Sequence, residues 1–117
     1  MAVKLNKLAV EHAKKLIKGK LEVAKHHSDW SEDKPTQDEV VKYLNTHDIQ
    51  DYALWFLGIN TDFPEESKER YDYPTGDLKI IHISALKDSL KHARHHGHTE
   101  IENAAKELIN LIETTIK

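Results

Sequence analysis

The sequence contains no cysteine among its 117 residues. This excludes disulfide bridges, thiolate zinc sites and cysteine nucleophiles. Because a reducing compartment suits such a chain, we expect a cytoplasmic protein. No apolar run approaches the roughly 20 residues that a membrane-spanning helix needs. The first twenty residues alternate lysine with apolar residues, unlike a secretory signal, so we expect no membrane partner.

Arginine and glycine are also scarce. Two arginines accompany fifteen lysines, and the formal net charge is −3. Binding to duplex nucleic acid usually requires a basic excess and arginine forks, so the composition argues against a nucleic-acid partner. With four glycines, the chain offers no phosphate-binding loop, no dinucleotide fingerprint and no nucleophile elbow. No set of residues argues for an enzyme.

The chain does contain enough apolar residues for one folded domain. Hydrophobic residues make up 38% of it and charged residues 32%. At this length a chain buries roughly two-thirds of the surface that its unfolded form exposes. The sequence therefore predicts a single helical domain over residues 1–117, with a hydrophobic core and no need of covalent cross-links.

Helical patterning accounts for most of the chain. Apolar residues recur every three or four positions in several segments. Thr36 and Glu39 have the spacing of a capping box, and Gly97 stands where the glycine after a helix belongs. The predicted helices cover Val3 to Ala24, a segment after Thr36, Leu78 to His96 with Asp77 as its N-cap, and a segment from Thr99.

The segment 52–59, Tyr-Ala-Leu-Trp-Phe-Leu-Gly-Ile, is the most apolar stretch. Its spacing fits a helix, but its short length, its aromatic residues and the glycine near its end also fit a buried strand. With the helical interpretation, the fold class is all-α, a compact bundle of four or five helices with a long ordered loop over residues 60–76. The alternative is an α+β fold with a short two-stranded piece near 52–59.

The loop before Asp77 is the first candidate site. Its Pro-x-Gly turn predicts a stiff backbone. Arg70 could bind an anionic ligand through its guanidinium fork, and Tyr71 could stack on a planar one. His82 could act as an acid or base beside Asp77. The alternative is structural, with Asp77 only capping a helix, Arg70 paired with a loop carboxylate and the tyrosine sealing the core.

A histidine-rich turn is the second candidate site. His92 and His96 are four residues apart on a predicted helix, so they share one face, and His98 follows just after the turn. Imidazole pairs of this spacing bind Zn²⁺, Ni²⁺ or Cu²⁺, so zinc or nickel is the cofactor that this turn would hold. The alternative is that the histidines pack at a helix end and interact with the helix dipole, in which case the protein has no cofactor.

Several motifs resemble a family of small uncharacterised bacterial proteins. They are Trp55-Phe-Leu-Gly58, then Arg70-Tyr-Asp-Tyr-Pro-Thr-Gly-Asp77 with His82, and Ile101-Glu-Asn-Ala-Ala near the C-terminus. The resemblance covers roughly Leu16 to Ile112. It implies no activity, and the histidine-rich turn departs from the pattern.

Helices, caps and a core without a catalytic set favour a protein-interaction module that binds another protein or a second copy of itself. The alternative is a metal- or small-molecule-binding protein that uses the His92–His98 turn or the Arg70–His82 loop.

Overall fold

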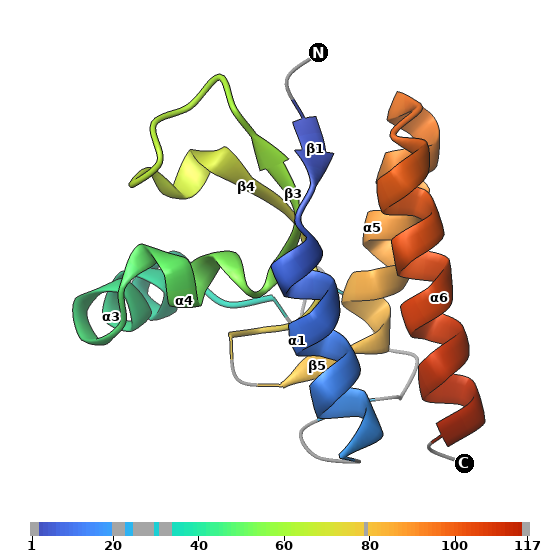
Figure 1. Ribbon diagram of the computed structural model, residues 1–117. Helices are drawn as coiled ribbons and strands as arrows, with labels where there is room; N and C mark the ends of the chain where they lie inside the picture. Colours follow the sequence, from blue (N-terminus) through green and yellow to red (C-terminus); the bar gives the residue numbers. More distant parts are fainter. Residues whose placement is uncertain (1–2, 20–22, 25–29, 31–33, 79, 116–117) are drawn as a thin grey trace.

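The computed structural model describes residues 3–19, 23–24, 30, 34–78 and 80–115, and in this part of the chain the fold is α+β (Figure 1). The elements in chain order are β1 (Val3–Leu5), α1 (Lys7–Lys18), β2 (Val23–Ala24), α3 (Gln37–Thr46), α4 (Ile49–Ala53), β3 (Phe56–Asn60), the 3-10 helix η1 (Lys68–Arg70), β4 (Tyr71–Pro74), β5 (Ile81–His82), α5 (Ile83–His96) and α6 (Thr99–Thr115).

The prediction of an all-α bundle is wrong, and the α+β alternative fits. β3 is the central strand of a three-stranded sheet in the order β1-β3-β4, antiparallel to both neighbours. The helix predicted over 52–59 is therefore wrong beyond Ala53, where α4 ends. Pairing on both sides, with Leu57 fully buried, satisfies the backbone of this apolar segment as completely as a helix would. The strand β4 also lies inside the segment predicted as a loop.

The predicted first helix is shorter at both ends than the Val3 to Ala24 pattern suggests. Residues before it form β1, and Asn6 marks the change of structure. The backbone N–H of Asn6 donates to the Leu57 carbonyl at 2.8 Å, and its buried side chain donates to the carbonyls of Ala53 and Phe56. Since these bonds tie the chain to β3, the helix can begin only at Lys7.

The predicted helix from Leu78 also begins late. The Asp77 carboxylate accepts a hydrogen bond from the backbone N–H of Ile80 at 2.9 Å, and Leu78 has a φ of 72°. This turn leads into β5, which pairs with β2 in parallel, and α5 begins at Ile83. Asp77 thus caps a turn and not a helix. The C-terminal prediction is confirmed, because Gly97 has a φ of 73° and ends α5.

Three long helices and the sheet enclose the core. α5 and α6 form a helical hairpin, and α1 lies beside α6 (Figure 1), where Lys14 and Glu107 form an ion pair at 2.7 Å. The largest fully buried apolar side chains come from all three helices, β3 and β5: Ile17, Leu57, Ile81, Leu86, Ile101, Leu108 and Ile112. None of the helices in the described ranges is long and apolar enough to cross a membrane.

α3 and α4 lie on the other side of the molecule from α6 (Figure 1). The predicted capping box of α3 is confirmed, since the Thr36 hydroxyl accepts from the Glu39 N–H and the Glu39 carboxylate accepts from the Thr36 N–H. Yet α3 has no buried residue, and its Val40, Tyr43 and Leu44 are only partly buried where they pack against the core.

Candidate functional site

The main candidate site is a cleft between β4 and α5, which we call the β4–α5 cleft. It has a volume of about 460 Å³, within the range of small-molecule sites. Polar side chains from three separate segments line it, together with a proline and two aromatic residues: Trp30, Lys34, Asp72, Tyr73, Pro74, Asp88, Ser89, His92 and His96.

α5 forms one wall of the cleft. Asp88, His92 and His96 follow one another at intervals of four residues, so helical geometry places all three on the same face. His92 Nε2 lies 3.5 Å from Asp88 Oδ2, and both side chains remain exposed. The hydroxyl of the buried Ser89 donates to the Pro74 carbonyl at 2.8 Å. That bond fixes the distance between the helix and β4 at the bottom of the cleft.

Tyr73 on β4 has a strained backbone. Its φ is 65°, a conformation that costs a bulky residue on the order of 1–3 kcal/mol. The residue before a proline is ordinarily extended, which makes this conformation at Tyr73 more unusual. Its N–H donates to the Asp72 carboxylate at 2.8 Å. Its ring lies against Gly58, where an added Cβ would come within 2.7 Å of Tyr73 Cδ2.

The hydroxyl of Tyr73 is buried and lies 2.6 Å from His98 Nδ1. Burial raises the pKa of this hydroxyl, and the nearby Asp72 carboxylate raises it further. His98 Nε2 is also buried and has no hydrogen-bond partner in the described part of the chain. His98 therefore contacts Tyr73 through Nδ1 and does not line the cleft itself.

The predicted metal ligands are only partly brought together. His92 and His96 line the same cleft, whereas the Nδ1 atom of His98 faces Tyr73, and the rings of His96 and His98 are 6.0 Å apart. Within the described ranges no three histidine or carboxylate side chains are grouped so that they could hold a metal ion. The zinc or nickel site stays a prediction.

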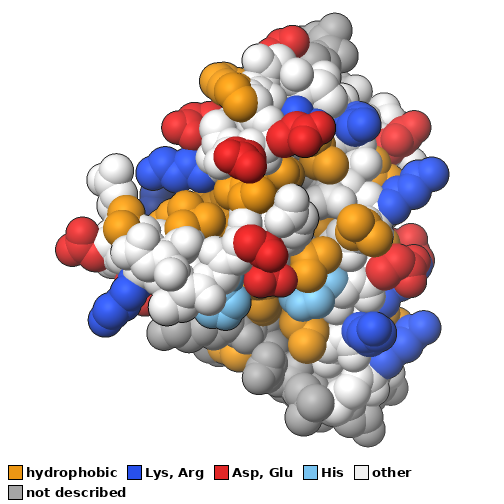
Figure 2. All heavy atoms as spheres, turned by 60° about the vertical axis from the view of Figure 1, so that its left-hand side comes forward, with side chains coloured by type: hydrophobic (Ala, Val, Ile, Leu, Met, Phe, Trp, Pro, Cys, Tyr) orange, Lys and Arg blue, Asp and Glu red, His pale blue; other side chains and the backbone are white. Residues whose placement is uncertain are grey.

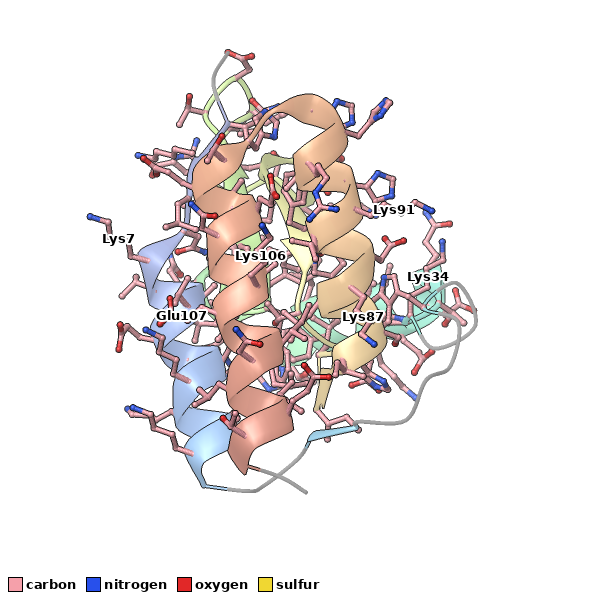
Figure 3. The ribbon with its side chains drawn as sticks, turned by 90° about the vertical axis from the view of Figure 1, so that its right-hand side faces the viewer. Lys7, Lys34, Lys87, Lys91, Lys106 and Glu107 are labelled. Atoms are coloured by element: carbon pink, nitrogen blue, oxygen red, sulfur yellow. The ribbon has the colours of Figure 1, made fainter. Side chains whose placement is uncertain are left out.

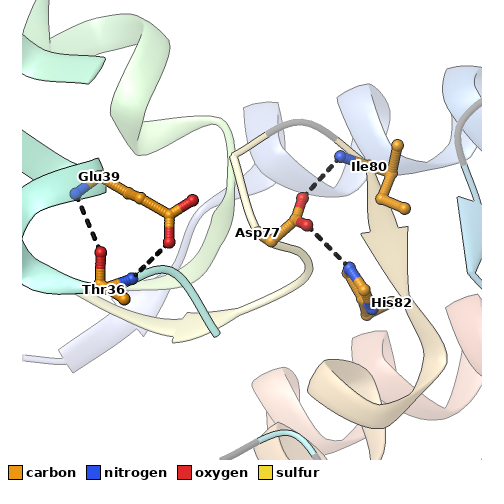
Figure 4. Close-up of polar contacts among 5 residues, drawn as sticks. All are labelled: Thr36, Glu39, Asp77, Ile80 and His82. Carbon is orange, nitrogen blue, oxygen red and sulfur yellow. Dashed lines mark hydrogen bonds and ion pairs between the residues drawn. The ribbon is translucent and has the colours of Figure 1, made fainter. Parts of the chain in front are cut away.

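The Arg70–His82 segment is likewise divided. His82 Nε2 lies 3.0 Å from Asp77 Oδ2 (Figure 4), and the His82 ring lies 5.6 Å from Trp30. Arg70 donates instead to the Phe63 carbonyl, and the Tyr71 hydroxyl donates to the Glu65 carbonyl. Arg70 and Tyr71 thus secure the loop between β3 and β4. Asp77 and His82 form a close pair beneath Trp30.

A second, largely apolar groove lies between α3 and the turn after Asp77. Its volume is about 400 Å³, and its walls include Tyr43 from α3 and Leu78 from the turn. Figure 4 shows the start of α3 beside this turn. Among the described residues other than glycine, only Tyr73 and Leu78 have a positive φ, and each lines one of these two cavities.

The other half of the β4–α5 cleft was not predicted from the sequence. Trp30, Lys34 and Asp72 were not candidates, although they line it. The lining residues come from three segments that lie far apart in the sequence. The packing of α5 on β4 brings Asp72 to the two histidines, and Trp30 and Lys34 line the same cleft from the segment before α3. No local sequence motif predicts a site that is formed by such distant segments.

These elements define a small α+β protein with a polar cleft beside an edge strand. No family model, curated protein or solved structure matches the chain. The resemblance to a family of small bacterial proteins therefore stays a prediction.

Proposed function

We propose that the protein binds a small molecule in the β4–α5 cleft. The observation that carries the proposal is the positive φ of Tyr73 at the floor of this cleft. Strained residues persist where the surroundings fix them, and they concentrate at ligand sites. Here Asp72, Gly58 and His98 all fix Tyr73. The strain is accompanied by a cavity of suitable volume and by polar groups of both charges.

A thermal-shift assay, which measures the Tm of the protein with and without each compound of a panel, tests the proposal. The panel contains free amino acids, carboxylates, amines, inorganic phosphate, and zinc and nickel ions. A ligand at one hundred times its dissociation constant stabilises the folded state by about 2.7 kcal/mol, so a clear rise in Tm is expected for at least one class.

Two variants locate the effect. A His92→Ala/His96→Ala double variant changes the cleft wall and should reduce the shift. Lys91→Ala serves as the control, because Lys91 is exposed on the same helix and does not line the cleft. The control should show the same rise in Tm as the unmodified protein. The proposal fails if no compound raises the Tm, or if the double variant shows the same rise as the control.

A protein-interaction module is the second candidate function. The side of the molecule carrying α3 and α4 gathers hydrophobic side chains with acidic ones among them (Figure 2). Val41 on α3 is 49% exposed, and the apolar groove lies beside the same helix. Large exposed apolar surfaces often mark partner sites.

Sedimentation velocity over a range of concentrations tests the self-association form of this second function. Concentration-dependent dimers that Val41→Glu abolishes would support it. Gln37→Glu is the control for the same change of charge, because Gln37 is exposed on α3 and does not line the groove. Monomers throughout would exclude self-association through α3.

A further inference from the structure

We infer that the ligand of the β4–α5 cleft carries a cationic and an anionic group on one small framework, as a free amino acid does. The inference rests on the proposed function and deepens it. The observation behind it is that fixed charges of both signs line one cleft without neutralising each other.

The positive charge is Lys34. Its backbone N–H donates to the Trp30 carbonyl at 2.9 Å, and both residues line the cleft. Figure 3 shows Lys34 next to α5, on the side where Lys87 and Lys91 lie. Lys34 is the lysine that lines the cleft, so the end of the cleft nearest its ammonium group is suited to a carboxylate.

The negative charges are Asp72 and Asp88. One oxygen of Asp72 accepts the Tyr73 N–H, and Asp88 lies 3.5 Å from the His92 ring. No ion pair joins Lys34 to either carboxylate in the described part of the chain, although all three line the same cleft.

This arrangement disfavours a ligand of one charge. An anion near Lys34 would still meet two carboxylates, and an amine near the carboxylates would still meet an ammonium group. A ligand that carries both charges can place each one against its opposite, and like-charge contacts of this kind impose specificity. Pro74 and Trp30 line the same cleft, so they offer an apolar surface to the framework that joins the two charges of the ligand.

Isothermal titration calorimetry on the complete chain tests the inference. The twenty common amino acids are screened first, and the tightest binder is then compared with two analogues of the same framework. One analogue lacks the ammonium group, and the other lacks the carboxylate. The amino acid should bind at least about tenfold tighter than either analogue, since each analogue loses one charge-assisted contact.

Two variants assign the charges. Lys34→Met should lower the affinity for the amino acid about tenfold and leave that for the amine analogue unchanged. Asp72→Asn should also lower the affinity for the amino acid about tenfold, and it should leave the affinity for the carboxylate analogue, which lacks the ammonium group, unchanged. Lys91→Met is the control, because Lys91 is exposed on α5 outside the cleft, and this variant should bind normally.

Several results would overturn the inference. It fails if either analogue binds as tightly as the amino acid, or if Lys34→Met and Asp72→Asn bind normally. It also fails if only zinc, nickel or phosphate binds in the cleft, but that result would leave the proposed function intact. If no compound of the panel binds in the cleft, the proposed function fails with it.

Discussion

Gly58 and Tyr73 lie against each other where β3 pairs with β4. A Cβ on Gly58 would come within 2.7 Å of Tyr73 Cδ2 and within 3.3 Å of the Ile101 side chain. The ring of Tyr73 is 4% exposed and held at its hydroxyl by His98, so it has little freedom to move away. The shape of the cleft floor thus depends on a glycine in the neighbouring strand.

Replacing Gly58 by alanine should therefore destabilise the protein. We expect a loss of about 1–3 kcal/mol, as for other overpacked cores, measured by urea denaturation. Gly19→Ala is the matched control, because Gly19 is exposed and has a φ of −73°, which alanine adopts freely. A Gly58→Ala variant as stable as the unmodified protein would show that Tyr73 is not held in place.

The hydroxyl of Tyr73 should matter more than that of Tyr71. Tyr73→Phe leaves His98 Nδ1 buried without its partner, which should cost about 1–3 kcal/mol. Tyr71→Phe removes a bond to the carbonyl of Glu65 on an exposed loop, so its cost should be smaller. Chemical denaturation of both variants measures the difference, and equal costs would contradict the role assigned to His98.

At this scale the sequence allowed part of the site to be predicted. The four-residue spacing correctly placed His92 and His96 on one helix face, because helical geometry is local. The positive φ of Tyr73 could not be predicted, since a residue before proline is normally extended. Lys34 and Asp72 carry no distinctive local pattern, so only tertiary packing shows that they belong to the same cleft.

The contact between α5 and α6 includes a small charged network. Glu102 on α6 accepts a hydrogen bond from Arg94 on α5 and forms an ion pair with Lys106. The hydrogen bonds from Arg94 and then Lys106 lower the pKa of the Glu102 carboxyl. The folded protein therefore favours the ionised form of Glu102 more strongly than the unfolded chain does.

The stability from Glu102 should depend on pH with a definite sign. A lowered pKa in the folded state stabilises the protein above the ordinary value of about 4.5. That contribution is lost as the pH falls through the folded-state pKa. Glu102→Gln should thus lower the Tm at pH 7, and its difference from the unmodified protein should vanish in acid. Glu113→Gln on the same helix is the control. A difference independent of pH would contradict this account.

Helices and strands differed in how far the sequence predicted them. The capping box at Thr36 and the glycine at position 97 are local signals, and both were confirmed. β1 and β5 contain three and two residues, too few for an alternating pattern to be recognised. β3 lies in an apolar run whose state depends on pairing with distant strands, which a local pattern does not contain.

For the molecule as a whole, local stability should be uneven. α6 contributes several fully buried side chains to the core, whereas α3 contributes none. Amides of α3 should therefore exchange with deuterium through local opening, and those of α6 through global unfolding. Native-state hydrogen exchange in low urea measures both. Equal opening free energies in α3 and α6 would show that α3 belongs to the cooperative core.

The segment from Asp72 to Leu78 contributes residues to both cavities. We propose that the polar cavity, between β4 and α5, is the ligand site. Two-dimensional ¹H–¹⁵N NMR during titration with the tightest compound of the panel tests it most directly. We expect the largest shifts at the amides of Asp72 and Tyr73 and of residues 88–96. Largest shifts at residues 39–46 and 77–78, beside the apolar groove, would contradict it.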